Sequence, residues 1–543
     1  MNRRLVGLVA IVTACGCAAA LLAQSAQPVP PAQPAPPAQP ARYDVIIRHG
    51  RVLDGTGNPW ILADVAIAGD RIAVVGVLGA ATAAREIDAT GLYVAPGFID
   101  THTHAGPGMA TAALAPAEPL LRQGITTIFI NPDGGGAIDI AAQRAALLKN
   151  GLGVNVGQMV PHGSARERVM GMADRHAEPH ELERMRELVR AGMREGAWGL
   201  SAGPFYVPGT YAEPREYVEV ARAAAEFGGV FQSHIRDESD YAGGVLASVD
   251  ELITVAREAK LPAIVTHIKV LGPGVWGFST PMIRRVEQAR AEGLEVWADQ
   301  YPYEASATGL VAALMPAWAQ AGGRAELRKR LADPATRAKI RAEMAENLRR
   351  RAGADRIQFR RVVEDPSIEG KTLARVARDR NADPVDVAIA LIETGSPAIV
   401  SFGMLEEDVR AFMKQPWTMT ASDGDLVPMG EGVPHPRVYG TFARKIRHYV
   451  VDEQVVRLED AIRSMTSLPA QVFRMKDRGV LRAGAWADIA VFDLARVRDT
   501  ATYDKPHQLA EGMIHVFVNG KAAVADGVVT PERAGRVLRR DRQ

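Results

Sequence analysis

Short strands are predicted at both ends of the chain, because apolar and polar residues alternate there between glycine-containing turns. In residues 42–95 the pattern runs through DVIIRHGRVLDGTG, ADVAIAGDRIAVVG and EIDATG. In residues 476–543 it returns in GVLRAGAWADIAVFDL and MIHVFVNGKAAVADG, with Asn-Gly and Asp-Gly turns. Two strand-rich ends around a long middle segment predict one small β-sandwich that both termini build.

The middle segment, residues 96–475, alternates short apolar strands with helical stretches, which is typical of parallel βαβ units. The candidate strands are residues 93–101, 125–131, 154–160, 198–202, 229–233, 263–266, 295–300, 398–403 and 418–422. An insertion at about 310–378 carries a charged helical stretch, RAELRKRLADPATRAKIRAEMAENLRRR. Strand 398–403 follows this insertion, so it is the candidate that we place outside the parallel strands.

The composition favours a large enzyme with an accessory domain. The chain has 543 residues, of which 47% are hydrophobic. The charges of its 64 basic and 63 acidic residues nearly cancel, so the chain lacks the excess of positive charge that is typical of nucleic-acid-binding proteins. Acidic residues are interleaved with the arginines of the insertion, so a lid or small helical subdomain is the better interpretation of that segment.

Residues 1–25 are typical of an export signal, in which Arg3 and Arg4 precede an apolar run and a small-residue cleavage site. A permanent membrane anchor is one alternative. A lipobox is another, because VTAC would place a lipid on Cys15. Residues 26–41 form a Pro-rich linker. We therefore expect an exported protein, periplasmic or lipid-anchored, that meets a membrane only through such an anchor.

Residues with metal-ligand chemistry follow the predicted strands. PGFIDTHTH places His102 and His104 two residues apart, so both would point to one face of a strand. His234 follows GVFQS, His267 follows PAIVT about one βα unit later, and Asp423 follows WTMTAS. The carboxyl ends of parallel strands converge at one edge, and this donor set suits Zn²⁺ best.

The chain resembles the D-aminoacylase (N-acyl-D-amino-acid deacylase) branch of the amidohydrolase superfamily over most of residues 43–530. The segments that carry the resemblance are PGFIDTHTH, GITTIFIN, GLSAGPFYVPGTYA, SHIRDE, THIKVLG, DQYPYEASATGL, TASDG and HPRVYGTFAR, with a looser match at VPHGSAR. It implies an α/β fold with a metal site at the mouth of a (β/α)8 barrel, which has eight strand positions for the nine candidates.

Carried over to this chain, the resemblance implies that His234 and His267 hold one tight Zn²⁺. His102, His104 and Asp423 would line a second, weaker position, and Asp423 would be the general base and acid. The family's bridging cysteine is absent, because both cysteines of this chain, Cys15 and Cys17, lie in the leader. GITTIFINPDGGG instead puts Asp133 at that place. A carboxylate is an acceptable Zn²⁺ ligand that could admit Mn or Co more readily, but Asp133 before three glycines could also be a turn residue.

The implied reaction is metal-dependent deacylation of small N-acyl-D-amino acids or related N-acyl amino acids and dipeptides. Zn²⁺ would polarise the amide, and Asp423 would move the proton to the departing nitrogen. Candidate substrate-binding residues are Tyr206, Arg236, Lys269, Tyr303 and Arg437. The acyl group, the side chain and the D preference are not determined by the sequence.

Two alternatives are open. A cyclic-amide hydrolase resembling hydantoinases or dihydroorotases usually carries a carboxylated lysine on the fourth strand. Residues 198–203 contain no lysine, which argues against this activity. A non-catalytic binding protein on the same fold is the second alternative, and the presence of four histidines with Asp423 argues against it.

Overall fold

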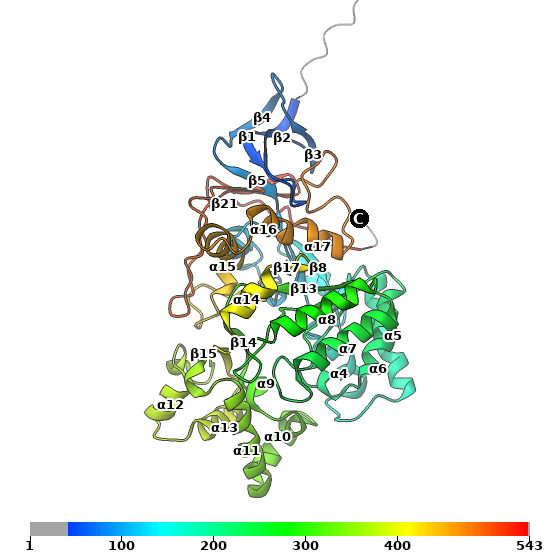
Figure 1. Ribbon diagram of the computed structural model, residues 1–543, viewed down its shortest axis with the longest axis vertical. Coiled ribbons are helices and arrows are strands. Elements are labelled where there is room, and N and C mark those ends of the chain that lie inside the picture. The colour runs from blue at the N-terminus through cyan, green and yellow to red at the C-terminus, as the bar shows by residue number, and fades with distance from the viewer. Residues whose placement is uncertain (1–41, 541–543) are drawn as a thin grey trace, which may run out of the picture. The chain divides into compact units, whose positions relative to one another are not determined.

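The computed structural model describes residues 42–540 (Figure 1). One nine-stranded sheet combines the two ends of this part of the chain, in the order β21-β20-β19-β18-β5-β1-β2-β3 with β4 paired to β1. Its strands are β1 (Arg42–Val52), β2 (Ile61–Ala68), β3 (Arg71–Gly76), β4 (Thr82–Asp88), β5 (Tyr93–Pro96), β18 (Ile489–Phe492), β19 (Met513–Val518), β20 (Lys521–Ala525) and β21 (Val528–Val529). The antiparallel pair of β5 and β18 joins the N-terminal strands to the C-terminal ones.

The turns of this sheet follow the residues that predicted them. Asn519 and Gly520 join β19 to β20 with φ values of 47° and 81°, and a type I′ turn requires positive φ at both central residues. Side chains from both ends of the chain, among them Ile47, Val65, Ile489 and Phe517, pack in one buried cluster. Both ends therefore build one β-structure.

Parallel strands form two further sheets, whose neighbours follow the order of the chain. The first contains β6 (Phe98–Asp100), β7 (Ile125–Ile130) and β8 (Asn155–Gln158), with the short β22 (Val537–Leu538) against β8. The second contains β9 (Val160–Pro161), β10 (Gly199–Ala202), β11 (Val230–Ser233), β12 (Ala263–Val265), β13 (Val296–Gln300) and β17 (Thr418–Thr420). The sheets meet at both edges. At one edge the Trp198 N–H, just before β10, donates to the Gln158 carbonyl of β8 at 2.9 Å, and at the other the Asp423 N–H donates to the His102 carbonyl at 2.9 Å.

Predicted strand 93–101 is split between two sheets. β5 belongs to the sheet of the chain ends, and β6 belongs to the parallel strands. Gly97 lies between them, where a Cβ atom would stand 2.3 Å from Thr126 Oγ1 of β7, so only glycine fits this close approach.

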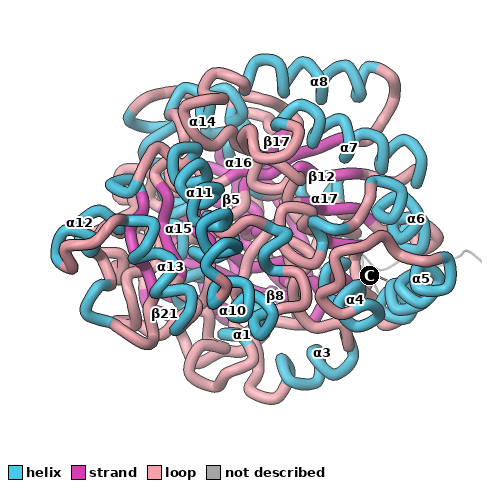
Figure 2. The backbone as a smooth tube through the Cα atoms, turned by 90° about the horizontal axis from the view of Figure 1, so that it is seen from below, coloured by secondary structure: helices cyan, strands magenta, loops and turns pink. Residues whose placement is uncertain are grey.

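Helices follow the parallel strands and cover their outer side, as α5, α6, α7 and α8 do in Figure 2. The helices between the parallel strands are α1 (Gly106–Met109), α2 (Glu118–Leu121), α3 (Ile140–Leu148), α4 (His162–Met170), α5 (Pro179–Arg194), α6 (Pro214–Ala225), α7 (Gly244–Ala259) and α8 (Ser279–Ala291), and α14 (Glu406–Met413) precedes β17. After β17 come α15 (Arg437–Arg444), the π-helix η5 (Lys445–Asp452), α16 (Leu458–Met465) and α17 (Ser467–Val472), and the 3₁₀ turn η1 (Gly209–Tyr211) follows β10. Amphipathic faces explain the packing of α5, which buries Met185, Val189 and Met193.

The insertion is a small α/β unit with its own core. It contains β14 (Ser306–Gly309), α9 (Leu310–Leu314), η2 (Ala317–Gln320), α10 (Arg324–Ala332), α11 (Pro334–Arg350), η3 (Ala354–Arg356), β15 (Ile357–Arg361), η4 (Pro366–Ile368), α12 (Leu373–Asp379), α13 (Pro384–Thr394) and β16 (Ala398–Ser401). β16 lies antiparallel between β14 and β15, so this unit continues past the predicted end at residue 378. Strand 398–403 is thus outside the parallel strands, as predicted.

No helix between residues 42 and 540 is long and apolar enough to cross a membrane. The predicted export signal, the lipobox at Cys15 and the Pro-rich linker lie outside the described residues.

A buried lysine supports the last parallel strand. Lys445 is 3% exposed, and its ammonium donates to Thr420 Oγ1 of β17 and to Ser464 Oγ, each at 2.8 Å. Burial lowers the pKa of Lys445 to about 7, against about 10.4 for a free lysine. Between these values the unfolded chain holds a proton that the folded chain lacks, so folding stability rises with pH across this window.

We expect Lys445→Met to melt roughly 2 °C or more above wild type at pH 7, because it removes the cost of burying an ammonium group. The difference in Tm should shrink as pH approaches about 9.5, where the wild-type penalty is relieved. Calorimetry at both pH values measures this. Lys414→Met, at an exposed lysine, is the control. A difference in Tm that does not change with pH would contradict the assignment.

Candidate metal centre

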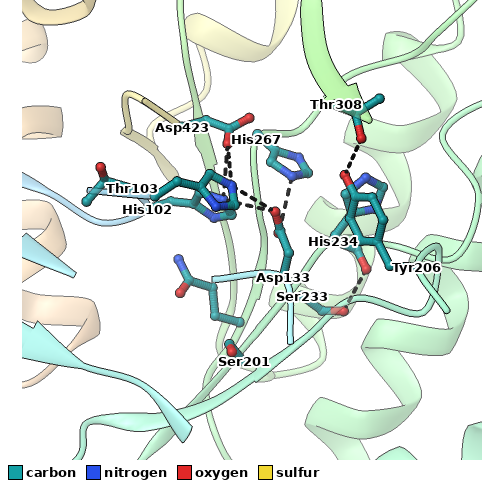
Figure 3. A network of polar contacts seen from close by, with 12 residues as sticks. His102, Thr103, Asp133, Ser201, Tyr206, Ser233, His234, His267, Thr308 and Asp423 are labelled. Atoms are coloured by element: carbon teal, nitrogen blue, oxygen red, sulfur yellow. Dashed lines mark hydrogen bonds and ion pairs between the residues drawn. The ribbon is translucent and has the colours of Figure 1, made fainter. Parts of the chain in front are cut away.

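Four of the predicted ligands meet at the ends of three parallel strands. His102 and His104 follow β6, Asp133 follows β7 and Asp423 follows β17. Asp133 Oδ2 lies 3.5 Å from His102 Nε2 and 3.4 Å from His104 Nε2. Asp423 Oδ1 lies 3.5 Å and 3.2 Å from the same two nitrogens (Figure 3). These ligand atoms lie within 4.8 Å of one another, so one cation could contact all four side chains.

A second group of donors stands on the other side of Asp133. It consists of His234 after β11, His267 after β12, and Glu238. Asp133 Oδ1 lies 3.4 Å from His267 Nε2, so one carboxylate oxygen faces each group. This placement between the groups is the one expected of a bridging ligand (Figure 3).

Sequence reasoning missed Glu238, although it lies in the SHIRDE segment four residues after His234. Its carboxylate accepts a hydrogen bond from Lys269 Nζ at 2.6 Å and lies 3.3 Å from His267 Nδ1. Lys269 therefore already compensates the charge of Glu238 within the protein. Because the Asp133 carboxylate has no such lysine partner among the residues that the structure describes, Asp133 is the better candidate ligand for an ion. Glu238 and Lys269 instead orient the His267 ring.

The donor set fits a divalent cation. Both ring nitrogens of His102 and Oδ1 of Asp133 are buried without a hydrogen-bond partner among the described residues. Buried polar atoms nearly always have a partner, so these atoms require something that no protein group supplies. Imidazole and carboxylate groups are ordinary ligands of Zn²⁺.

The loop after β7 holds Asp133 in an unusual backbone conformation. Asn131 and Asp133 have φ values of 63° and 53°. The Asn131 carbonyl accepts a hydrogen bond from Ser201 Oγ at 2.6 Å, and its side-chain amide pairs with Gln143 at 2.9 Å and 2.7 Å. The backbone of Asp133 thus adopts a turn conformation, while its carboxylate faces the histidines. Asp133 can therefore be both a turn residue and a metal ligand, the two roles that the sequence left open.

Left-handed backbone also occurs at His267 and Asp423, with φ values of 35° and 50°. Non-glycine residues rarely adopt such values, and they concentrate where a site requires a particular side-chain direction. The His267 backbone is held by Asp299 of β13, which accepts its N–H at 2.6 Å.

The two carboxylates are ionised. Burial acts to raise the pKa of Asp133, but the charges of His102 and His267 hold it well below its usual value. Burial also acts to raise the pKa of Asp423, but the charge of Arg437, together with that of His267, lowers it well below its usual value.

The pKa values of the histidines favour binding of the first ion on the side of His234. Burial lowers the pKa of His234 to about 4, so its ring is neutral at pH 7. Burial acts against charge on His104 too, but the neighbouring carboxylates of Asp133 and Asp423 raise its pKa to about 9. An ion beside His104 must displace a proton, whereas His234 offers a free lone pair.

A cavity of about 730 Å³ opens beside these ligands. Arg437 lines it, with Nη1 2.8 Å from Asp423 Oδ2. Tyr206 also lines it, and its hydroxyl lies 3.3 Å from Thr308 Oγ1 of β14. Lys269 lies behind His267, 2.6 Å from its Nδ1, and does not line the cavity. Of the predicted substrate-binding residues, Arg437 and Tyr206 are therefore the two that can meet a substrate directly.

Besides Lys269, two more of the predicted substrate-binding residues do not line this cavity. Arg236 makes hydrogen bonds to Glu251 and to the carbonyls of Thr210 and Ala212, so its guanidinium ties α7 to the loop after β10 and does not line this cavity. Tyr303 packs against His435, with ring centroids 5.1 Å apart, and under the Arg444 guanidinium. Tyr301, two residues earlier, is the tyrosine that packs against Arg437, and it is buried and does not line the cavity either. Its ring centroid lies 4.8 Å from the Arg437 guanidinium and 5.6 Å from Lys269 Nζ.

Comparison with known proteins places this geometry in a family. Residues 85–524 match the amidohydrolase family model. The chain belongs to the amidohydrolase family. It is 35% identical over 530 residues to N-acyl-D-glutamate deacylase of Alcaligenes xylosoxydans xylosoxydans, over 92% of this chain and 97% of that protein.

Two solved structures are also similar to this amidohydrolase. D-aminoacylase, studied for one-metal activation and second-metal attenuation of its binuclear metal centre, has a TM-score of 0.79 at 32% identity, over 92% of this chain and 100% of that one. N-acyl-D-glutamate deacylase from Bordetella bronchiseptica, complexed with zinc and a phosphonate mimic of the tetrahedral intermediate, has a TM-score of 0.78 at 32% identity, with the same coverage. The predicted resemblance to the D-aminoacylase branch is confirmed.

Proposed function

We propose that this amidohydrolase is a metal-dependent deacylase of N-acyl-D-amino acids. The observation that carries the proposal is the Asp133 carboxylate between two histidine groups, next to Asp423 and at the edge of a cavity that Arg437 lines. The relatives named for D-aminoacylase and N-acyl-D-glutamate deacylase support it, because each matches this chain over nine-tenths of its length.

We propose further that the parallel strands form a (β/α)8 barrel and that the nine-stranded sheet is the β-sandwich expected of the chain ends. β8 and β9 are separated by Met159 alone and occupy one strand position, so β6, β7, β8 with β9, β10, β11, β12, β13 and β17 fill eight positions in sequential order, which supports the barrel. The hydrogen bond from the Asp423 N–H to the His102 carbonyl, between the ends of its first and last strands, supports it too. The ligand candidates follow these strands at their carboxyl ends, where barrel enzymes carry their catalytic groups.

His234, His267 and Asp133 would hold the main ion, for which we propose Zn²⁺, and His102, His104 and Asp423 would hold a second one. A bound ion supplies positive charge that polarises the acyl carbonyl and acidifies water. The protein's own side chains would transfer the proton and bind the substrate.

Asp423 can accept a proton from the attacking water and deliver it to the amine nitrogen, because the Arg437 charge keeps the carboxyl ionised at neutral pH. Arg437 has further N–H groups that can bind the substrate carboxylate from the cavity side. Burial raises the pKa of Tyr206, so its hydroxyl stays protonated and can donate to the oxygen that becomes negative during attack. A cyclic-amide hydrolase would need a lysine on β10, and Gly199–Ala202 has none.

The experiment is a comparison of amine release from N-acetyl-D- and N-acetyl-L-amino acids by the protein stripped with chelator and then reloaded with Zn²⁺. We expect turnover only after reloading, with the D substrates at least about 10-fold faster in kcat/KM. A reloaded protein that binds metal and releases no amine from any of these substrates would contradict the proposal.

We also propose that the protein is exported, on the strength of the leader and Pro-rich linker in its sequence. Mass spectrometry of the native N-terminus is the measurement. A start after Ser25 is expected for a soluble periplasmic protein, and a lipidated Cys15 for a tethered one. An intact Met1 would contradict both forms of export by cleavage.

A further inference from the structure

The two arginines that line the cavity are each paired with a carboxylate. Besides the ligand candidates, the charged residues that line the cavity are Glu167, Arg360, Asp425 and Arg437. Arg437 pairs with Asp423, and Arg360 Nη1 hydrogen-bonds to Asp425 Oδ2. Among the described lining residues, each arginine therefore has a carboxylate partner, and Arg437 is the one placed to bind the substrate's own α-carboxylate.

The Arg360–Asp425 pair joins the insertion to the loop that carries the proposed base. Arg360 lies on β15, and Asp425 follows Asp423 by two residues. The Arg360 carbonyl accepts the N–H of Val433 at 2.8 Å, which holds this loop against β15. The Arg360 and Asp425 side chains are 21% and 23% exposed, so the pair faces the cavity and is not sealed within the protein.

The next residue of β15 provides an internal comparison. The pairing of β15 with β16 shifts register between Phe359 and Arg361, so Arg360 lies at an irregularity of the kind that redirects a side chain. Arg361 pairs with Glu431 at 2.6 Å and does not line the cavity. Two adjacent arginines thus hold two carboxylates of the same loop, and Arg360 alone does so at the cavity wall.

The rest of the wall near this pair offers no positive charge. The insertion contributes Ala307, Thr308, Gly309 and Ala398, and Glu167 of α4 is an exposed carboxylate with no ion-pair partner in residues 42–540. A substrate with an acidic side chain would find the charge of Arg360 already compensated by Asp425 and would meet the uncompensated charge of Glu167. Discrimination of this kind depends on repulsion as well as on attraction.

We propose that the Arg360–Asp425 pair makes this enzyme select N-acyl-amino acids with uncharged side chains over those with acidic ones, and that Asp425 is a specificity-determining residue. The inference rests on the proposed deacylase function and names the side-chain class of its substrate. It distinguishes this chain from a relative whose name specifies glutamate, although that relative is 35% identical.

The test compares N-acetyl-D-glutamine with N-acetyl-D-glutamate, which are nearly equal in size and differ in side-chain charge, and includes N-acetyl-D-leucine as a neutral apolar substrate. Zn²⁺-loaded wild type should show kcat/KM at least about 10-fold higher for glutamine than for glutamate. Asp425→Asn frees the Arg360 guanidinium, so kcat/KM for glutamate should rise about 10-fold while that for glutamine changes less than about 3-fold. Glu431→Gln, which releases Arg361 outside the cavity, should leave the ratio unchanged.

Arg360→Gln tests the same ion pair by removing its cation instead of its carboxylate. It removes the cation and leaves the Asp425 carboxylate at the wall, so the preference for glutamine over glutamate should become stronger. A wild type that prefers glutamate overturns the inference, as does a ratio that neither Asp425→Asn nor Arg360→Gln shifts in the predicted direction. These results would leave the deacylase function standing. Failure of metal-loaded wild type on all three substrates would instead overturn the proposed function.

Discussion

Asp423→Asn is expected to lose nearly all turnover while it folds and retains metal. The wild-type carboxylate lies within 3.5 Å of both His102 and His104 and is held ionised by Arg437, so it is ready to accept a proton. An asparagine amide has nearly the same shape but cannot take that proton. General acid–base groups typically contribute about 10²–10⁴-fold to rate, and we expect kcat to fall within that range.

The measurement is kcat on an N-acyl-D-amino acid, with metal content and circular dichroism determined on the same sample. Glu431→Gln removes a carboxylate from the same loop without touching the ligand candidates, and it should keep wild-type kcat. A folded, metal-loaded Asp423→Asn with nearly normal kcat would rule out the proton transfer proposed for this residue.

Asp133→Ala is expected to lose metal as completely as His234→Ala does. Asp133 offers one oxygen to each group of histidines, and no other carboxylate lies between those groups in the described part of the chain. Residues that only support a ligand cost about 10–100-fold in metal affinity when mutated, so loss of a ligand should cost at least about 100-fold.

Metal content after dialysis, and the Kd for Zn²⁺ from competition with a chelator, measure this effect without reference to activity. Asp133→Cys restores the thiolate that the resemblance implies and should retain the metal. Asp139→Asn changes a nearby aspartate at the start of α3 and serves as the control. Full occupancy with normal activity in Asp133→Ala would mean that His234 and His267 hold the ion without this carboxylate.

The ligand candidates could be found from the sequence because they follow strands directly. His102, His234, His267 and Asp423 come immediately after, or within a few residues of, short buried strands. Parallel strands in sequential order bring such positions to one edge, so the strand pattern was sufficient to place them together.

Residues beyond the strand ends were harder to place, because side-chain direction in a loop has no period. The sequence suggested Tyr303, whereas Tyr301, directly after β13, lies at Arg437. Arg236 lies two residues after a ligand candidate but is held by Glu251 of the following helix. Its partner is determined by helix packing, which the SHIRDE segment does not encode.

The boundary of the insertion was also hard to predict from the sequence. Its charged helices were recognisable from their spacing, but its boundary depends on β16 pairing with β14 across most of the insertion. Such pairing between distant segments leaves no local pattern. Arg360 reaches the cavity for the same reason, through the pairing of β15 with β16.

The central claim is that a carboxylate, in place of a cysteine, holds the catalytic metal between the two histidine groups. Anomalous diffraction from crystals of the Zn²⁺-loaded protein tests it most directly. The account predicts an ion about 2.0–2.2 Å from an Asp133 oxygen and about 2.0–2.1 Å from nitrogens of His234 and His267. An ion held by His234, His267 and Glu238, with Asp133 more than about 3 Å away, would contradict it.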